Sequence, residues 1–505
     1  MYDLIIKSGN IADGSGKASY VSDIAISDGK IVCISENIKG ESKEAIDASG
    51  LTVTPGFIDS HSHSDYAVFD YPDMIEKVEQ GITTSIGGQC GMTLAPNGVK
   101  GDKLETFGTM VNAAKDIPLG SNLKNFVGHS ALRITAMGYE NRKPTSSELE
   151  TRKVYLREAM ENGALGLSYG LIYTPSCYAE TDELISLAKV VKEYDGLLSA
   201  HIRNEGFEFI EAVEEFLTVI KETGVKAVFS HHKSMYKPNW GKVNESLEMI
   251  DSAIKDGYDI HIDVYPYEAS STSLAATIIA KEFRALDSKG IAEMLKDKVM
   301  QDRIKDAYIK RNGDSLSNLL LVECPAFSEF EGMRIDEIAK LLGKDDFEAA
   351  FDILIGSNAN ANICNFSMSE DDIETVLKYE RAMICTDSSV AKDAKTYHPR
   401  LKASFPRFFG KYVRERQVVT LEEAVRKCTF MPALVYGLEN KGKIEAGFDA
   451  DICIFDAEKI IDKASYVNCA ERCEGLKFVI IGGEIVAENA VYNGKKKGRF
   501  ILDER

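Results

Sequence analysis

The chain has 505 residues, of which 44% are hydrophobic and 28% are charged, and its 60 basic and 79 acidic side chains give a formal net charge of −19. This length exceeds one ordinary domain, and the composition is that of a globular protein without an evident disordered tract. The negative charge repels nucleic acid and anionic membrane surfaces, so we expect a small-molecule partner.

Three further features bear on the location of the protein. No stretch approaches the roughly 18 consecutive apolar residues of a membrane span, and the start, MYDLIIKSGN, lacks a basic region followed by a long apolar segment. The ten cysteines are scattered and do not form a disulfide framework. We therefore expect a cytoplasmic protein with no membrane association, while the oligomeric state is left open.

Both ends of the chain predict short β-strands. The first 50 residues contain DLIIKSG and DIAISDGKIVCIS, and similar runs, GKIEAGFDADICIFD and LKFVIIGGEIVAENA, occur near the other end. Each segment is too small to stand alone, so we predict one small β-sandwich domain built from residues 1–54 and 436–505. Two unrelated β extensions are the alternative.

Between residues 55 and 435, short β-rich runs alternate with amphipathic helical segments, which indicates a parallel sheet with crossover helices. Eight runs qualify as strands: 51–59, 83–90, 123–129, 164–170, 197–203, 226–232, 258–266 and 381–387. They predict a (β/α)8 barrel of the TIM type, with the chemistry at the carboxyl ends of its strands. A doubly wound open sheet competes, but no GxGxxG motif opens a helix.

Residues 268–380 are far more chain than one crossover needs, so we predict an insertion after the seventh strand, as a lid or helical subdomain over the barrel mouth.

The first candidate site is the stretch LTVTPGFIDSHSHSD, where a strand-like run ends in His61 and His63. Residues two apart in a strand point the same way, so both imidazoles would lie on one face as a metal-ligand pair. A polar turn after a buried strand is the alternative reading.

Cys90, His201 and His231 lie at or near the ends of three other predicted strands. Alone, Cys90 in GGQCG would be read as buried packing. As a thiolate beside two imidazoles, however, it completes a mixed nitrogen and sulfur set that favours Zn²⁺ over the hard cations Mg²⁺ and Ca²⁺.

In AVFSHHK, strand alternation allows only one of the two adjacent histidines to point into the barrel. We favour His231 as the ligand, because Lys233 then shares its face and would bind an anion. His232 would face the helix layer or support a neighbour.

Asp387 closes the eighth predicted strand in ICTDSS. Near a zinc-bound water, an aspartate there can accept the water's proton during attack on a carbonyl and deliver it to the leaving nitrogen. Capping of the next turn is the alternative role.

Together, GFIDSHSHSD, GQCG, AHIRNE, SHHK, DVYPY, Asp387 and HPR…FPR resemble the D-aminoacylase (N-acyl-D-amino-acid deacylase) branch of the amidohydrolase superfamily, and the match covers essentially the whole chain. The resemblance implies zinc-dependent hydrolysis of the amide of an N-acyl-D-amino acid. It implies that Cys90, His201 and His231 hold a tight zinc, that His61 and His63 form a second, weaker site with Cys90 as a bridge, and that Asp387 is the acid and base. The substrate carboxylate would be held by Lys233, Tyr265 and Arg400, with Ser271 nearby.

The chain also departs from that family. Ser388 and Ser389 follow Asp387 where the family usually has glycine, and residues 268–380 differ most. No lysine occurs in ALGLSYG, which argues against the carboxylated-lysine bridge of hydantoinases and dihydroorotases.

Hydrolysis of cyclic amides, of dipeptides or of another N-acyl amine is the runner-up function, and a non-catalytic metal-binding protein is the third hypothesis. A basic group near the pocket would favour acidic D-amino acids; the candidates are Lys392, Lys395, Arg203 and Arg407.

Overall fold

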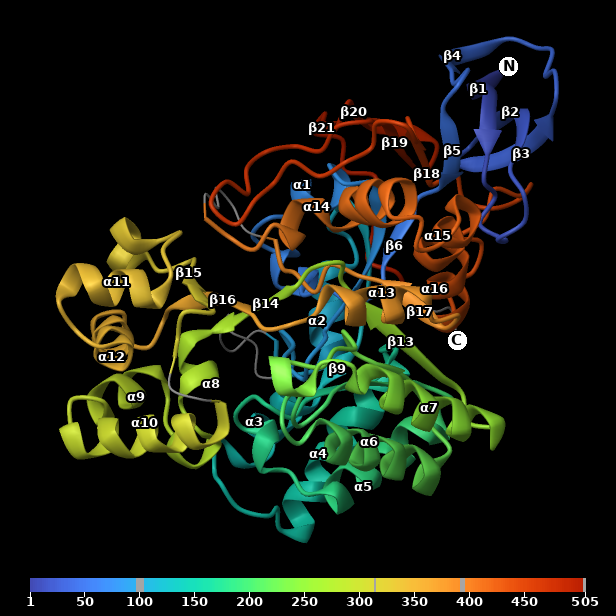
Figure 1. Cartoon of the computed structure of the whole chain (residues 1–505). Coiled ribbons are helices and arrows are strands. Elements are labelled where there is room, and N and C mark those ends of the chain that lie inside the picture. Colours follow the sequence, from blue (N-terminus) through green and yellow to red (C-terminus); the bar gives the residue numbers. More distant parts are fainter. Residues whose placement is uncertain (97–103, 313–314, 391–395, 503–505) are drawn as a thin grey trace.

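The computed structural model describes residues 1–96, 104–312, 315–390 and 396–502. The chain forms a central barrel surrounded by helices, a sheet assembled from both ends of the chain, and a mostly helical lobe that extends from one side (Figure 1). Among the described residues, no helix has both the length and the apolar character that a membrane span requires.

Parallel strands form the barrel, in two hydrogen-bonded groups. The first group is β6 (Phe57–Asp59), β7 (Ile82–Gly87) and β8 (Asn122–Asn125), and the second is β9 (Val127–Gly128), β10 (Gly166–Gly170), β11 (Leu197–His201), β12 (Lys226–Phe229), β13 (Ile260–Val264) and β17 (Ala382–Ile384).

Two junctions bring these groups into one ring. β8 and β9 are separated only by Phe126, so they occupy one strand position. At the other junction, the Ser60 amide donates to the Ile384 carbonyl at 3.4 Å, and Ser62 forms a parallel bridge with Ser388. The described residues therefore supply the eight strand positions of the predicted barrel.

Helices cover the outside of the barrel because each presents an apolar stripe to it. In α6 (Phe209–Thr223) the buried residues include Phe209, Val213 and Phe216, at helical spacing. The other helices of this layer are α1 (Ile75–Val78), α2 (Phe107–Ala114), α3 (His129–Met137), α4 (Ser146–Glu161), α5 (Thr181–Glu193), α7 (Lys242–Lys255), α13 (Glu370–Lys378), α14 (Arg400–Arg407), α15 (Leu421–Cys428) and α16 (Phe430–Val435).

Strands from both ends of the chain pair in one nine-stranded sheet, which confirms the predicted union of the termini. Its N-terminal members are β1 (Tyr2–Ile11), β2 (Tyr20–Ser27), β3 (Lys30–Ser35), β4 (Ser42–Asp47) and β5 (Thr52–Pro55). Its C-terminal members are β18 (Ile452–Phe455), β19 (Leu476–Ile481), β20 (Glu484–Glu488) and β21 (Val491–Tyr492). The two sets meet where β5 pairs antiparallel with β18, at the top of the molecule in Figure 1.

The predicted first barrel strand, 51–59, is two strands. β5 belongs to the sheet of the termini, whereas β6 belongs to the barrel, and Gly56 separates them. A Cβ atom at Gly56 would lie 2.2 Å from Oγ1 of Thr83, so only glycine permits this close approach.

After β13 the chain leaves the barrel and builds the insertion. Its strands β14 (Ala269–Ser273), β15 (Leu319–Leu321) and β16 (Asn362–Phe366) form an antiparallel sheet. Its helices are α8 (Leu274–Ile278), α9 (Ser288–Met294), α10 (Lys298–Asn312), α11 (Ile335–Leu342) and α12 (Asp346–Gly356). They enclose a separate apolar core, and the lobe lies to the left in Figure 1. α13, at the end of the predicted insertion range, packs against α7 and β17 of the barrel.

Candidate metal centre

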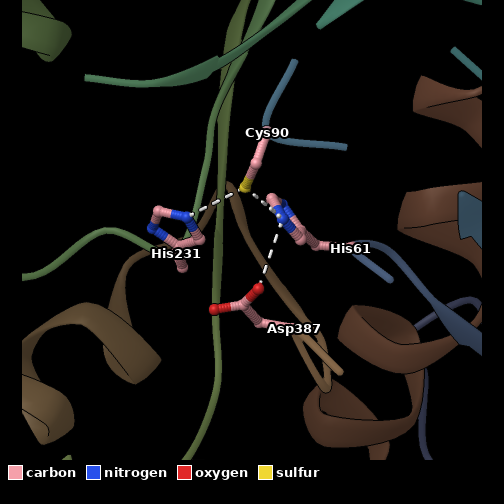
Figure 2. A group of neighbouring side chains, drawn as sticks. All are labelled: His61, Cys90, His231 and Asp387. Carbon is pink, nitrogen blue, oxygen red and sulfur yellow. Dashed lines mark hydrogen bonds and ion pairs between the residues drawn. The ribbon is translucent and has the colours of Figure 1, made fainter. Parts of the chain in front are cut away.

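A cysteine, three histidines and an aspartate meet at the carboxyl ends of the barrel strands. Sγ of Cys90 lies 3.3 Å from Nε2 of His61, 3.6 Å from Nδ1 of His201 and 3.6 Å from Nε2 of His231. Bonds of about 2.0–2.3 Å at tetrahedral angles place the ligands of one zinc ion at about this separation. Figure 2 shows the rings of His61 and His231 turned toward Cys90 and the carboxylate of Asp387 turned toward His61.

Asp387 contacts His61 and His63. Its Oδ1 is 3.5 Å from Nε2 of His61 and 3.3 Å from Nε2 of His63, while Oδ2 accepts a hydrogen bond of 2.8 Å from Nη1 of Arg400. The structure thus brings together all five predicted metal ligands and the predicted catalytic carboxylate.

Charges in the cluster favour the ligating form of the cysteine. Burial alone raises the pKa of the Cys90 thiol, but the neighbouring His61, His201 and His231 lower this pKa well below its ordinary value. Burial likewise raises the pKa of Asp387, but the charges of Arg400 and His231 hold it well below its usual range. The centre therefore offers a thiolate and an ionised carboxylate.

Three of the residues have left-handed backbones two or three positions after their strands end, with φ of 53° at Cys90, 36° at His231 and 47° at Asp387. Such conformations are costly for residues other than glycine and persist where surrounding contacts fix them. The amide of His231, for example, donates to Oδ1 of Asp263 at 2.6 Å. The surrounding fold thus directs the three side chains toward one point.

Two buried carboxylates face the outer nitrogens of the histidines, and the sequence reasoning missed both. Glu205 places Oε1 3.0 Å from Nδ1 of His231 and Oε2 3.7 Å from Nε2 of His201. Asp263 places Oδ2 3.5 Å from Nδ1 of His61. A carboxylate in this position fixes the orientation of a ligating imidazole and makes it more basic. Their positions in the sequence could have indicated them, because Glu205 follows His201 by four residues and Asp263 lies within a predicted strand.

The other histidines near predicted strand ends lie elsewhere. His232 hydrogen-bonds through Nε2 to Oγ of Ser246 at 2.8 Å and packs against Phe229, so it faces the helix layer as predicted. His129 was predicted to end the third strand, but it begins α3 and binds Glu183 outside the centre.

A cavity of about 270 Å³ opens onto the centre and is lined by several predicted substrate-binding residues together with the ligands, including His201, His231, Lys233, Tyr265, Ser271 and Asp387. Ser271 belongs to β14, so the insertion supplies part of the wall. Arg400, also predicted to bind substrate, is not one of the residues that line this cavity. Its guanidinium lies 4.8 Å from the centroid of the Tyr265 ring, and its Nη2 donates to the Ser271 carbonyl at 3.3 Å.

Several basic side chains near the cavity already have acidic partners. Lys233 donates to Oε1 of Glu205 at 2.6 Å, and the guanidinium of Arg203 forms two hydrogen bonds of 2.8 Å with Glu215. Arg407 pairs with Asp462 and Glu268. Lys392 and Lys395 lie outside the described residues.

The donor set fits zinc. Ligand atoms of His61, Cys90, His231 and Asp387 all lie within 4.8 Å of one another, and every one of these residues is buried. Thiolate and imidazole together are the donors that zinc prefers, and hard cations take oxygen ligands instead.

A parallel barrel with such ligands at the carboxyl ends of its strands is the architecture of metal-dependent hydrolases. The model of the Amidohydrolase family matches residues 44–487, and the chain belongs to this family.

The family contains well-matched relatives. The chain is 31% identical to a D-aminoacylase of Alcaligenes xylosoxydans xylosoxydans over 99% of this chain and 97% of that protein. It is 32% identical to an N-acyl-D-glutamate deacylase of the same organism, over 95% and 93%. Among solved structures, the N-acyl-D-glutamate deacylase of Bordetella bronchiseptica superposes with a TM-score of 0.84 at 31% identity, covering 99% of this chain and 100% of that one. That enzyme was solved with zinc and a phosphonate inhibitor that mimics the tetrahedral intermediate.

Proposed function

We propose that this protein hydrolyses the amide bond of N-acyl-D-amino acids and releases a carboxylic acid and a free D-amino acid. The observation that carries the proposal is the convergence of Cys90, His201 and His231 beside Asp387 at the end of a cavity. Relatives that match nearly the whole chain are a D-aminoacylase and an N-acyl-D-glutamate deacylase, which supports the same chemistry here.

Cys90, His201 and His231 would hold the tightly bound zinc, and His61 and His63 would form a second, weaker site that shares Cys90. When bound, zinc polarises the scissile carbonyl and lowers the pKa of bound water to about 7. Glu205 and Asp263 face the outer nitrogens of the imidazoles, at 3.0 Å for His231 and 3.5 Å for His61, and the inner nitrogens face Cys90.

Asp387 acts as the general base and then as the general acid. It is ionised, so Oδ1 can take a proton from the attacking water, whose oxygen bonds to the carbonyl carbon. The same proton then passes to the amide nitrogen as the bond between carbon and nitrogen breaks. Arg400 holds Oδ2 and thereby leaves Oδ1 directed at the centre.

Lys233, Tyr265 and Arg400 would bind the α-carboxylate of the substrate, with Ser271 beside them. Arginine suits this role because its planar fork binds a carboxylate through two hydrogen bonds. The Lys233 ammonium already contacts Glu205 and both the ring and the carbonyl of His231, and Arg400 donates to Asp387 and to the Ser271 carbonyl. Binding of the substrate carboxylate would therefore require these side chains to exchange partners.

Linear amides are favoured over cyclic ones. β10, the fourth barrel strand, reads GLSYG and offers no lysine for carboxylation, so the bridge expected of hydantoinases has no donor there. The ten cysteines form no disulfide with one another, which supports a reducing compartment such as the cytoplasm.

The test is release of acetate from N-acetyl-D-methionine, N-acetyl-D-glutamate and N-acetyl-D-aspartate, each against its L enantiomer, before and after treatment with a chelator. We expect release from at least one D substrate, none from L substrates, and loss of activity with chelator that added zinc restores. Equal hydrolysis of both enantiomers, or activity on hydantoins alone, would contradict the proposal. The preferred D substrate would identify the side-chain class.

A further inference from the structure

A completely buried lysine contacts the residues on both sides of the catalytic aspartate in the chain. Lys77, on α1, has a side chain with 0% exposure. Its ammonium donates to Oδ2 of Asp59 at 3.1 Å, to Oγ1 of Thr386 at 2.7 Å, and to the carbonyl and Oγ of Ser388 at 3.0 and 2.9 Å. Its partners therefore include both residues that flank Asp387 in the chain.

Thr386 and Ser388 also form hydrogen bonds with each other and with Asp59. The amide and hydroxyl of Thr386 donate to the two carboxylate oxygens of Asp59 at 2.8 and 2.6 Å. The amide and hydroxyl of Ser388 donate to Oγ1 of Thr386 at 3.2 and 2.9 Å. Asp59 ends β6, so this network ties the loop after β17 to the neighbouring strand.

The network explains how Asp387 keeps its left-handed backbone. With φ of 47°, this residue has a conformation that is costly without support from its surroundings. The Asp387 amide donates to the His61 carbonyl at 2.8 Å, and the residues before and after it are held by Lys77. Ser388 supplies two of the oxygens that the ammonium contacts.

The same segment also secures the partner of Asp387. Gln80, three residues after Lys77, donates to the Leu401 carbonyl at 2.9 Å and accepts from the Phe405 amide at 3.5 Å. Both contacts are on α14, the helix that begins with Arg400. α1 and the residues after it thus hold the carboxylate on one side and its guanidinium partner on the other.

We propose that Lys77 is a positioning residue, which fixes the left-handed turn at Asp387 through Thr386 and Ser388 and so sets the direction of the catalytic carboxylate. This inference rests on the proposed role of Asp387. Because small displacements of a catalytic group have large effects on rate, loss of the ammonium should lower kcat more than it changes KM.

The chain provides a matched control. Lys427, on α15, is also fully buried, and it donates to the carbonyls of Tyr379 and Ala382. Ala382 begins β17, whereas Thr386 lies just beyond its end. The two lysines therefore contact opposite ends of the same strand, and Lys427 lies at the end that contributes to stability and not to chemistry.

The experiment compares Lys77→Met, Ser388→Ala and Lys427→Met with the wild type and with Asp387→Asn, by kcat, KM, bound zinc and thermal unfolding. For Lys77→Met we expect kcat to fall by at least about tenfold, with KM and zinc content nearly unchanged. Ser388→Ala should show a smaller fall of the same kind. Lys427→Met should lower the unfolding temperature and leave kcat within about twofold of the wild type.

Wild-type kcat in Lys77→Met, or an equal loss of kcat in Lys427→Met, would overturn the positioning role. If Lys77→Met does not fold, Ser388→Ala decides, because it leaves no buried charge unpaired; an unchanged kcat there overturns the role. An inactive wild type, or a fully active Asp387→Asn, would instead refute the proposed function. Crystal structures of Ser388→Ala and Lys77→Met then decide the positioning role independently, since an unchanged positive φ at Asp387 in both would contradict it.

Discussion

Two buried groups of charged side chains in this molecule contain histidine and acid, and they differ in where their polar atoms point. Around Glu183, the carboxylate accepts from His129 at 3.0 Å, from Arg133 at 2.7 Å and from Arg152 at 2.6 Å. Both ring nitrogens of His129 are engaged, one by Glu183 and the other by Ser176 at 2.7 Å. Neither ring nitrogen of His129 is therefore left to face a metal ion.

The metal centre is arranged differently. Each imidazole of His61, His201 and His231 turns one nitrogen to a carboxylate and the other toward Cys90. The cluster borders a cavity, and its inner atoms are spaced as ligands of one ion. A histidine near a strand end therefore does not mark a metal site; the convergence of several inner nitrogens on a thiolate does.

Cys90→Ala should have the largest effect on the metal centre and should leave the cluster around Glu183 intact. Loss of the thiolate removes a zinc ligand, so we expect turnover to fall by more than about 10³-fold, equivalent to about 4 kcal/mol in the barrier. Zinc per chain after gel filtration and steady-state rates measure the effect. Cys428→Ala, in a buried cysteine far from the ligands in sequence, is the control and should keep zinc and activity. Retention of both by Cys90→Ala would refute the site.

Glu183→Gln should destabilise the fold without disturbing the metal. The substitution leaves Arg133 and Arg152 buried without their shared counter-ion, which should cost about 3–5 kcal/mol of unfolding free energy. Denaturant unfolding measures the loss, and competition with a chelator measures zinc affinity. A fall in zinc affinity as large as any fall in stability would show that the two groups are not separate.

The stabilising contribution of Glu183 should also depend on pH. Burial raises the pKa of this carboxyl, but His129 and Arg152 hold it well below its usual range in the folded chain. Its contribution is therefore complete above the unfolded pKa of about 4.3 and is lost as the pH falls toward the folded value. The difference in unfolding free energy between wild type and Glu183→Gln should be constant from about pH 7 to 5 and shrink below about pH 4. A difference that grows in acid would contradict this.

Glu205→Gln should lower activity less than Cys90→Ala does, and it should do so by weakening zinc binding. Its amide cannot polarise His201 and His231 as the carboxylate does, so zinc affinity should fall by about 10–100-fold, and excess zinc should restore most of the activity. Glu208→Gln, in an exposed residue of the same segment, is the matched control. If Glu205→Gln binds zinc as the wild type does, Glu205 has no role in orienting the ligands.

The sequence predicted the features that depend on periodicity and on residue type. Alternating segments gave the barrel, similar strands at both ends gave the joined sheet, and Cys90, His201 and His231 were selected from strand ends. Gly56, which divides the run 51–59 between two sheets, left no mark in the hydrophobic pattern, because both halves are fully buried. His129 was misplaced because a strand end and a helix start are adjacent there.

Contacts between distant segments could not be predicted. Lys77 meets Ser388 across more than 300 residues, and its position on a short helix gives no indication of burial. The left-handed backbones of Cys90, His231 and Asp387 depend on the same long-range contacts, because local sequence would not favour them in residues other than glycine.

The central claim is that the converging cluster is a catalytic centre in which Asp387 transfers the proton. Turnover of N-acetyl-D-amino acids by Asp387→Asn, measured together with bound zinc, tests it most directly. We predict wild-type zinc content and a loss of kcat of about 10²–10⁴-fold, since the amide cannot accept the proton of water. Wild-type turnover with zinc in place would contradict the account.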